Sequence, residues 1–256
     1  MQRVELDGVQ VEYELTGEGD PVVLPHARPF VMWHLPLVAE LRDVSVLRYR
    51  REAPMGWQVE DDARLCARLL RGLGIRRAHV IGHSYGGLVA LELARQGVAD
   101  LRSLALLEPA TIGLLPPGEA TVRTAPLVKM AQVEGAGTAM DRFLRVITGP
   151  EGPELLDKLV PGALTDALSH ARGFFAVELP AAARWTFAPS DATTIGLPVL
   201  HLRGAASAPR FAEGAALVES WFPAAEHRML DGVDHLMMTR VPETTAALLD
   251  RFWRSA

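Results

Sequence analysis

The segment Gly82-His83-Ser84-Tyr85-Gly86 follows the pattern Gly-x-Ser-x-Gly, which holds a serine between two small residues. In this pattern the serine sits on a tight strand-to-helix turn with strained backbone angles, so the flanking positions must lack bulk. The helix that follows directs its N-terminus at the site, and the backbone N–H of Tyr85 can therefore face a developing oxyanion. We predict Ser84 to be the nucleophile of an acyl-transfer reaction. The alternative is a glycine-rich turn with a solvated serine.

The elements that must position Ser84 alternate between strands and helices. An apolar strand over 78–82 and a helix over 85–96 flank the serine on either side. We expect further strands over 4–6, 9–15, 21–24, 44–49 and 101–107, and helices over 32–41 and 60–73. This order predicts a mostly parallel sheet with helices on both faces.

The alternation stops after Glu108 and resumes near residue 197. The intervening stretch holds Pro-Pro, Gly-Pro and isolated Gly sites with helical patches between them, and no β-branched run stands out. Strands over 198–203 and 226–230 and helices over 211–222 and 239–253 then complete the pattern. We therefore predict an α/β core made of residues 1–109 and 197–256, with a helical insertion over 110–196.

Composition excludes several classes of function. A net charge of −5 offers no basic footprint for nucleic acid. Cys66 is the only cysteine, which excludes a disulfide framework and a cysteine-based zinc site. No apolar run reaches the ~18 residues of a membrane helix, and charged residues interrupt the N-terminus where a signal peptide would be apolar. We expect a cytoplasmic protein with a small-molecule substrate, no nucleic-acid or membrane partner, and an open oligomeric state.

The chain resembles the α/β-hydrolase fold family over nearly its whole length. The matching segments are residues 21–26, Tyr49-Arg50-Arg51, the turn at Ser84, residues 198–204 and Gly232-Val233-Asp234-His235. The resemblance implies a mostly parallel sheet of about eight strands, and the insertion over 110–196 looks like the helical cap that covers the pocket in this family.

The resemblance also implies the partners of Ser84. A serine hydroxyl needs a general base, and the family's chain order places that base on the loop after the last strand, where His235 lies. Many relatives carry the acid after the seventh strand, but Ser207 stands at that position and cannot stabilise an imidazolium by charge. Other branches place the acid after the sixth strand, and we therefore predict Glu108. Asp234 is expected to point away from His235, and Asp231 is a weaker reserve.

The loop that supplies the second oxyanion donor in this family usually reads His-Gly-x-Pro, whereas here it reads His26-Ala27-Arg28-Pro29. The matching donor is the backbone N–H of Arg28, acting together with that of Tyr85. The Arg28 side chain has two interpretations. It lies beside the pocket and favours an anionic substrate, or it points outward and pairs with an acid.

These features predict a serine hydrolase that cleaves a small carboxylic ester or lactone through an acyl-enzyme, with no cofactor or metal. Cys66 is interpreted as a packing residue. Within the enzyme class, a C–C bond hydrolase, a perhydrolase or a lyase can use the same triad. From another class, a ligand-binding receptor of this fold with little turnover fits the same residues.

Overall fold

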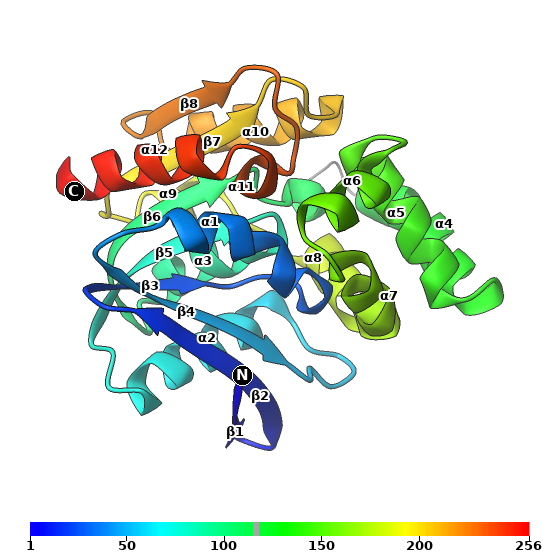
Figure 1. Cartoon of the computed structure of the whole chain (residues 1–256), viewed down its shortest axis with the longest axis horizontal. Coiled ribbons are helices and arrows are strands. Elements are labelled where there is room, and N and C mark those ends of the chain that lie inside the picture. Colours follow the sequence, from blue (N-terminus) through cyan, green and yellow to red (C-terminus); the bar gives the residue numbers. More distant parts are fainter. Residues whose placement is uncertain (115–117, 256) are drawn as a thin grey trace.

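A central sheet of eight strands organises the computed structural model, which describes residues 1–114 and 118–255 (Figure 1). The strand order is β1-β2-β4-β3-β5-β6-β7-β8, with β1–β2 and β2–β4 antiparallel and every later pair parallel. The strands are β1 (Gln2–Leu6), β2 (Val9–Gly17), β3 (Asp20–Leu24), β4 (Val44–Arg51), β5 (Arg77–His83), β6 (Asp100–Leu107), β7 (Val199–Gly204) and β8 (Glu226–Leu230). Each was predicted from the sequence, and the α/β fold class is confirmed.

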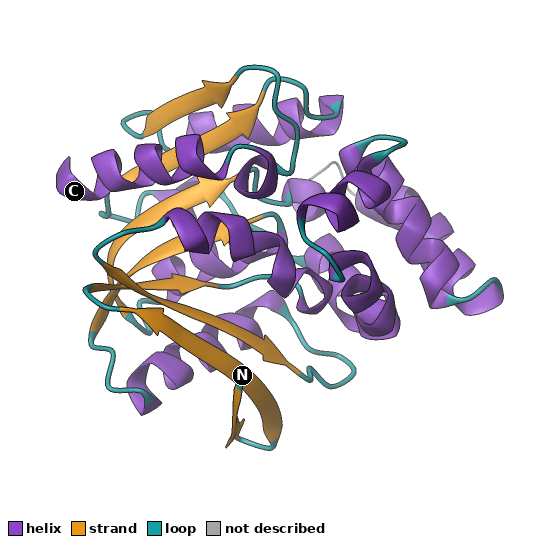
Figure 2. Ribbon diagram, in the orientation of Figure 1, coloured by secondary structure: helices purple, strands orange, loops and turns teal. Residues whose placement is uncertain are grey.

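Helices cover both faces of this sheet because its strands alternate between two apolar cores (Figure 2). In β3, Val23 faces one core while Val22 and Leu24 face the other. The first core packs against α2 (Val59–Gly72), α3 (Tyr85–Gln96) and α10 (Pro209–Trp221). The second packs against α1 (Leu35–Glu40), α11 (Met237–Arg240) and α12 (Pro242–Ser255). Two-sided burial explains why the central strands read as nearly continuous apolar runs.

The described residues between β6 and β7 form helices and loops without a strand, and they gather beside the sheet (Figure 1). They comprise a 3-10 turn η2 (Thr111–Leu114), the helices α4 (Glu119–Val133), α5 (Ala136–Thr148), α6 (Gly152–Leu159) and α7 (Ala163–Gly173), a π-helical segment η3 (Phe174–Glu178), α8 (Leu179–Arg184) and α9 (Pro189–Ala192). Residues 115–117 of the predicted insertion lie outside the described residues. We call the described part of 110–196 the cap.

Two predicted helices differ from the structure. The helix expected over 32–41 is a 3-10 segment η1 (Arg28–His34) followed by the short α1, with a non-helical residue at Phe30. The helix expected over 239–253 is α11 and α12, separated at Val241. Val241 precedes Pro242, and the proline ring disfavours helical backbone angles in the residue before it. No described helix has both the length and the apolarity to cross a lipid bilayer.

Candidate active site

Ser84 occupies the turn between β5 and α3 with backbone angles φ 51° and ψ −119°. Its N–H donates to the carbonyl of Leu107 (3.1 Å), and its own carbonyl accepts the N–H of Ala110 (3.0 Å). The turn is tight enough that a Cβ on Gly86 would lie 1.8 Å from the carbonyl oxygen of Pro25. This explains why the position two residues after the serine must be glycine. Holding a serine in this conformation costs on the order of 1–3 kcal/mol, which the surrounding backbone hydrogen bonds must offset.

Ser84 also reaches a cavity. It is partly exposed, whereas every other residue from 78 to 93 is buried. The cavity measures about 160 Å³. Its walls are mostly apolar and come from both core and cap, including Phe30, Phe143, Phe174, Leu179, Phe211 and Leu217. A nucleophile that opens from a buried turn into an apolar pocket can meet a substrate with little competing water.

His235 and Glu108 form a buried pair at the carboxyl ends of the parallel strands, where Ser84 also lies. Glu108 follows β6, and its Oε2 lies 2.7 Å from Nδ1 of His235 on the loop after β8. Burial by itself raises the pKa of Glu108, but the hydrogen bond and charge of His235 lower it below the ordinary value. The carboxylate is therefore held ionised against the imidazole. This leaves Nε2 of His235 as the ring atom available for proton transfer, and it has no hydrogen-bond partner among the described residues, Ser84 included.

Three further contacts hold this pair in place. The N–H of Gly204 donates to Oε1 of Glu108 (2.7 Å), and Nε2 of His83 donates to the carbonyl of His235 (3.1 Å). The ring of Phe211 stacks on His235 with centroids 4.2 Å apart and planes 19° apart. Glu108 itself has φ 41°, so both it and Ser84 adopt a backbone region that side chains rarely occupy. Phe211 was not identified from the sequence, because a helical aromatic residue carries no signal of its partner.

The other candidate acids lie elsewhere. Asp234 accepts the N–H of Leu236 (3.0 Å) and pairs with Arg240 (2.6 Å), so its carboxylate is already engaged. Asp231 is exposed. Ser207 follows β7 as aligned, but Nδ1 of His235 hydrogen-bonds to Glu108. The geometry thus brings together Glu108 and His235, which were predicted as a pair, leaves Asp234 and Asp231 outside, and places the Ser207 hydroxyl close enough to Glu108 to help lower its pKa.

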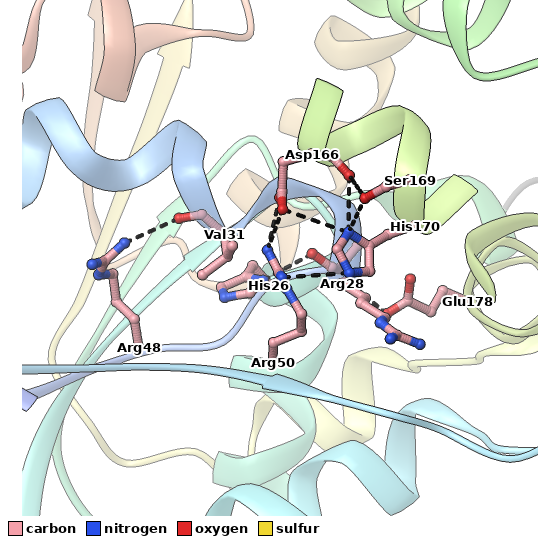
Figure 3. Close-up of polar contacts among 10 residues, drawn as sticks. His26, Arg28, Val31, Arg48, Arg50, Asp166, Ser169, His170 and Glu178 are labelled. Carbon is pink, nitrogen blue, oxygen red and sulfur yellow. Dashed lines mark hydrogen bonds and ion pairs between the residues drawn. The ribbon is translucent and has the colours of Figure 1, made fainter. Parts of the chain in front are cut away.

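The expected pair of oxyanion donors is not assembled in this structure. The N–H of Tyr85 lies in the first turn of α3, where backbone amides have no partner within the helix. The N–H of Arg28, however, donates to Oε1 of Glu178 in the cap (2.8 Å), as Figure 3 shows. This corrects the prediction for Arg28, because a buried carboxylate takes the amide that was expected to face the substrate. Glu178 was missed by the sequence analysis, since its position in η3 shows no motif.

Glu178 belongs to a buried charged network that reaches Tyr85, one of the residues lining the pocket. Its Oε1 also pairs with Arg51 (2.7 Å), which binds both oxygens of Asp62 (2.5 and 2.6 Å). Asp62 in turn accepts the hydroxyl of Tyr85 (2.5 Å). Two carboxylates thus share one guanidinium, and Oε2 of Glu178 has no partner among the described residues. Burial raises the pKa of Glu178, and the attraction of Arg51 offsets part of that increase.

The Arg28 side chain pairs with Glu52 (2.9 Å). Of its two interpretations, an anion-binding role in the pocket or an outward pairing with an acid, the structure shows the second. Arg28 does not line the cavity, whereas Arg123 and Arg210 do. Arg123 pairs with Glu213 at 3.5 Å. The positive charge beside the pocket therefore comes from the cap and from α10, which the sequence could not indicate.

Cys66 is buried, and burial raises the pKa of its thiol to about 12. A thiol with so high a pKa is a poor nucleophile near neutral pH, which agrees with a packing role. The absence of a cofactor or metal from the reaction stays a prediction.

Comparisons with known proteins bear on the family and the fold of the chain. A family model described as "Alpha/beta hydrolase family" matches residues 22–248. A putative carbamate hydrolase RutD of Stutzerimonas stutzeri (strain A1501) is 35% identical over 110 residues, covering 37% of this chain. The chain spans less than half the length of the curated relatives it matches, 22% and 41%.

Two solved structures share the fold over almost the full chain. One is a thermophilic esterase from Thermogutta terrifontis, with a TM-score of 0.81, 23% identity, and coverage of 100% of this chain and 99% of the other. The second is an enol-lactonase from Burkholderia xenovorans LB400, with a TM-score of 0.78, 21% identity, and coverage of 99% and 100%. At these identities the likeness establishes the fold alone.

Proposed function

The chain belongs to the alpha/beta hydrolase family, and we propose that it is a serine hydrolase cleaving a small carboxylic ester or lactone through an acyl-enzyme. The observation that carries the proposal is the buried 2.7 Å contact between His235 Nδ1 and Glu108, and a strained and accessible Ser84 supports it. Acyl transfer requires a base that is oriented by a buried acid, together with an accessible hydroxyl.

The proposed reaction assigns one role to each group. Ser84 Oγ attacks the substrate carbonyl while Nε2 of His235 takes its proton, and Glu108 stabilises the imidazolium that forms. The backbone N–H of Tyr85 stabilises the oxyanion, and the imidazolium returns its proton to the leaving alkoxide as the acyl-enzyme forms. Water, deprotonated by His235, then releases the acid product and restores Ser84.

The small, largely apolar pocket supports an ester or lactone as the substrate class. The esterase and enol-lactonase among the structural neighbours fit this choice. The partial match to a putative carbamate hydrolase adds a carbamate as a second acyl substrate, because serine attack on its carbonyl uses the same groups.

The proposal is tested with p-nitrophenyl acetate and butyrate, and with a fluorophosphonate probe that labels activated serines. Wild-type protein should turn over both esters and take up the label, and Ser84→Ala should abolish both signals because the nucleophile is gone. Unchanged turnover in Ser84→Ala would contradict the proposal. Strong labelling with negligible turnover of esters, lactones and carbamates would instead favour a ligand-binding receptor.

The acid is tested separately. Glu108→Gln should lower kcat by about 10²–10⁴-fold while KM changes little, because the amide cannot stabilise an imidazolium by charge. Ser207→Ala is the comparison variant, since it alters the other aligned acid position; it removes a hydroxyl near Glu108 but leaves the charge of Glu108, so it should lower kcat far less than Glu108→Gln does. The opposite ranking of the two variants would overturn the assignment of Glu108.

A further inference from the structure

Two histidines on neighbouring strands converge at the β8 edge of the sheet. His201 of β7 and His227 of β8 are register partners, and their rings are nearly perpendicular at 82°. Their Nδ1 atoms lie 3.3 Å apart. Val199, two residues before His201, belongs to the core that packs against α10, so strand alternation turns His201 toward that helix.

The distance between the two nitrogens suits a shared metal ion. Two imidazole nitrogens bound to zinc at about 2.0–2.1 Å with a tetrahedral angle lie roughly 3.4 Å apart. A second contact fixes the tautomer of one ring, because Nε2 of His227 donates to the carbonyl of Phe222 (2.9 Å). The Nδ1 of His227 is then deprotonated, and its lone pair is directed at His201. A backbone carbonyl that accepts the remote N–H is also the usual support of a metal-binding histidine.

Glu219 of α10 completes the set. One carboxylate oxygen of this exposed residue and one nitrogen of each histidine lie within 4.8 Å of one another. No hydrogen bond or ion pair engages the Glu219 side chain among the described residues, so it can turn toward the histidines at little cost. We propose that His201, His227 and Glu219 form a binding site for a divalent transition-metal ion of the zinc class.

The chemistry of the ligands selects the metal. Two imidazoles and one carboxylate suit Zn²⁺, Co²⁺, Ni²⁺ or Cu²⁺, whereas Mg²⁺ and Ca²⁺ prefer an all-oxygen set. In the metal-free protein Nδ1 of His201 donates to Nδ1 of His227, so when the ion binds to both Nδ1 atoms the proton of His201 leaves Nδ1 and the ring carries its proton on Nε2. A water molecule then fills the fourth position. Arg203, two residues along β7, opposes a cation, and the negative charge of Glu219 offsets it.

The site lies outside the catalytic machinery but shares an element with it. None of its three residues lines the cavity at Ser84. Near the other end of α10, Phe211 stacks on the catalytic histidine candidate His235. A bound ion would join β7, the edge strand β8 and α10, and so hold the element that supports His235.

The test measures metal binding directly, by titration calorimetry of the metal-stripped full chain with ZnCl₂ and by the visible absorption of bound Co²⁺. We expect one saturable Zn²⁺ site and the intense bands of tetrahedral Co²⁺. His227→Gln should weaken Zn²⁺ binding by about 100-fold or more, and Glu219→Gln by about tenfold or more. Glu219 is exposed, so its variant keeps the proposal testable even where a histidine variant folds poorly.

Glu243→Gln is the matched control, because it removes an exposed carboxylate from a different helix and should leave the affinity unchanged. Ser84→Ala should likewise bind Zn²⁺ as the wild type does, which separates this site from the proposed catalytic one. Absence of saturable binding, or an affinity that neither His227→Gln nor Glu219→Gln alters, would overturn the proposal.

Discussion

At the scale of single residues, backbone strain and buried charge mark the candidate site. The described non-glycine residues with positive φ are Asp7, Asp43, Ser84 and Glu108. The two aspartates fit ordinary turn chemistry, since aspartate tolerates this region through its short polar side chain. Ser84 and Glu108 are not residues that favour this backbone region. Both lie at the carboxyl ends of central parallel strands, Ser84 after β5 and Glu108 after β6. Strain at these two positions is therefore most simply explained by the need to aim their side chains.

Glu178 leads to a prediction at this scale. Its carboxylate occupies the N–H of Arg28 and adds negative charge near the proposed oxyanion site. Glu178→Ala should free that amide and raise kcat for p-nitrophenyl butyrate by about tenfold, a fraction of the ~10²–10³ that one oxyanion donor is worth. The measurement is steady-state kinetics at pH 8.

Glu178→Gln serves as the control for the same position. It removes the charge but retains an oxygen that can accept the Arg28 N–H, so its kcat should rise less than that of Glu178→Ala. A fall in kcat in both variants, with the melting temperature unchanged, would show that the carboxylate assists the reaction instead of obstructing it.

At the scale of elements, polar contacts fasten the cap to the core. Arg50 of β4 donates to both carboxylate oxygens of Asp166 in α7 (2.9 and 2.7 Å), and His170 lies beside this pair (Figure 3). Glu178 supplies a second attachment through Arg51. Because Arg50 and Arg51 both lie on β4, the position of the cap over the pocket depends on this strand.

The attachment through Asp166 gives a prediction for the motion of the cap. Asp166→Asn leaves the half-buried Arg50 without a charged partner, which should destabilise the docked α7 by about 1–3 kcal/mol. Amide hydrogen exchange over 163–173 should then accelerate by roughly 5–150-fold. Asp141→Asn is the control, because Asp141 pairs with Arg145 within α5. Equal exchange of α7 in wild type and Asp166→Asn would contradict this role.

At the scale of the whole molecule, four buried histidines form a chain of ring contacts from the site into the core. The centroids of His235 and His83 lie 4.4 Å apart, those of His83 and His34 5.6 Å, and those of His34 and His26 5.6 Å. Burial lowers the pKa of His26 and His83 well below 6.5, and it lowers that of His34 to about 3, helped by the charge of Arg48. These three rings are therefore neutral in the folded protein, and protonation favours the unfolded chain.

The sign of the pH dependence follows from these shifts. Well above pH 6.5 neither state protonates the rings, and stability is at its full value. Below pH 6.5 the unfolded chain takes up protons that the folded protein refuses, so each histidine costs about 1.4 kcal/mol per pH unit until its folded pKa is reached. For His34 this window runs from 6.5 down to about 3.

His34→Leu tests this account, because neither ring nitrogen of His34 has a hydrogen-bond partner among the described residues. Urea unfolding of both proteins at pH 8 measures the packing cost of the substitution alone. Between pH 6.5 and 5.5 the free energy of unfolding of the variant should then fall by about 1 kcal/mol less than that of the wild type, because the unfolded histidine is already half protonated at pH 6.5. Identical falls in the two proteins would refute the account.

The sequence by itself determined the strands, their order along the chain and the tight turn at Ser84. These features can be recognised locally in the sequence. Parallel strands that are buried on both faces are continuous apolar runs, and the tight turn at Ser84 is flanked by small residues. The pairing of His235 with Glu108 was also predicted from the resemblance to the family, because the family's chain order indicates which loops lie together at the carboxyl ends of the strands.

Only the tertiary structure decided the contacts made by the cap and by α10. That Glu178 takes the Arg28 amide, that Phe211 stacks on His235, and that Arg123 and Arg210 face the pocket all depend on how helices distant in sequence pack together. The same is true of Glu219 beside His201 and His227, where a strand pair and a helix meet. Helical periodicity indicates which face is apolar, but it does not say which neighbour that face will meet.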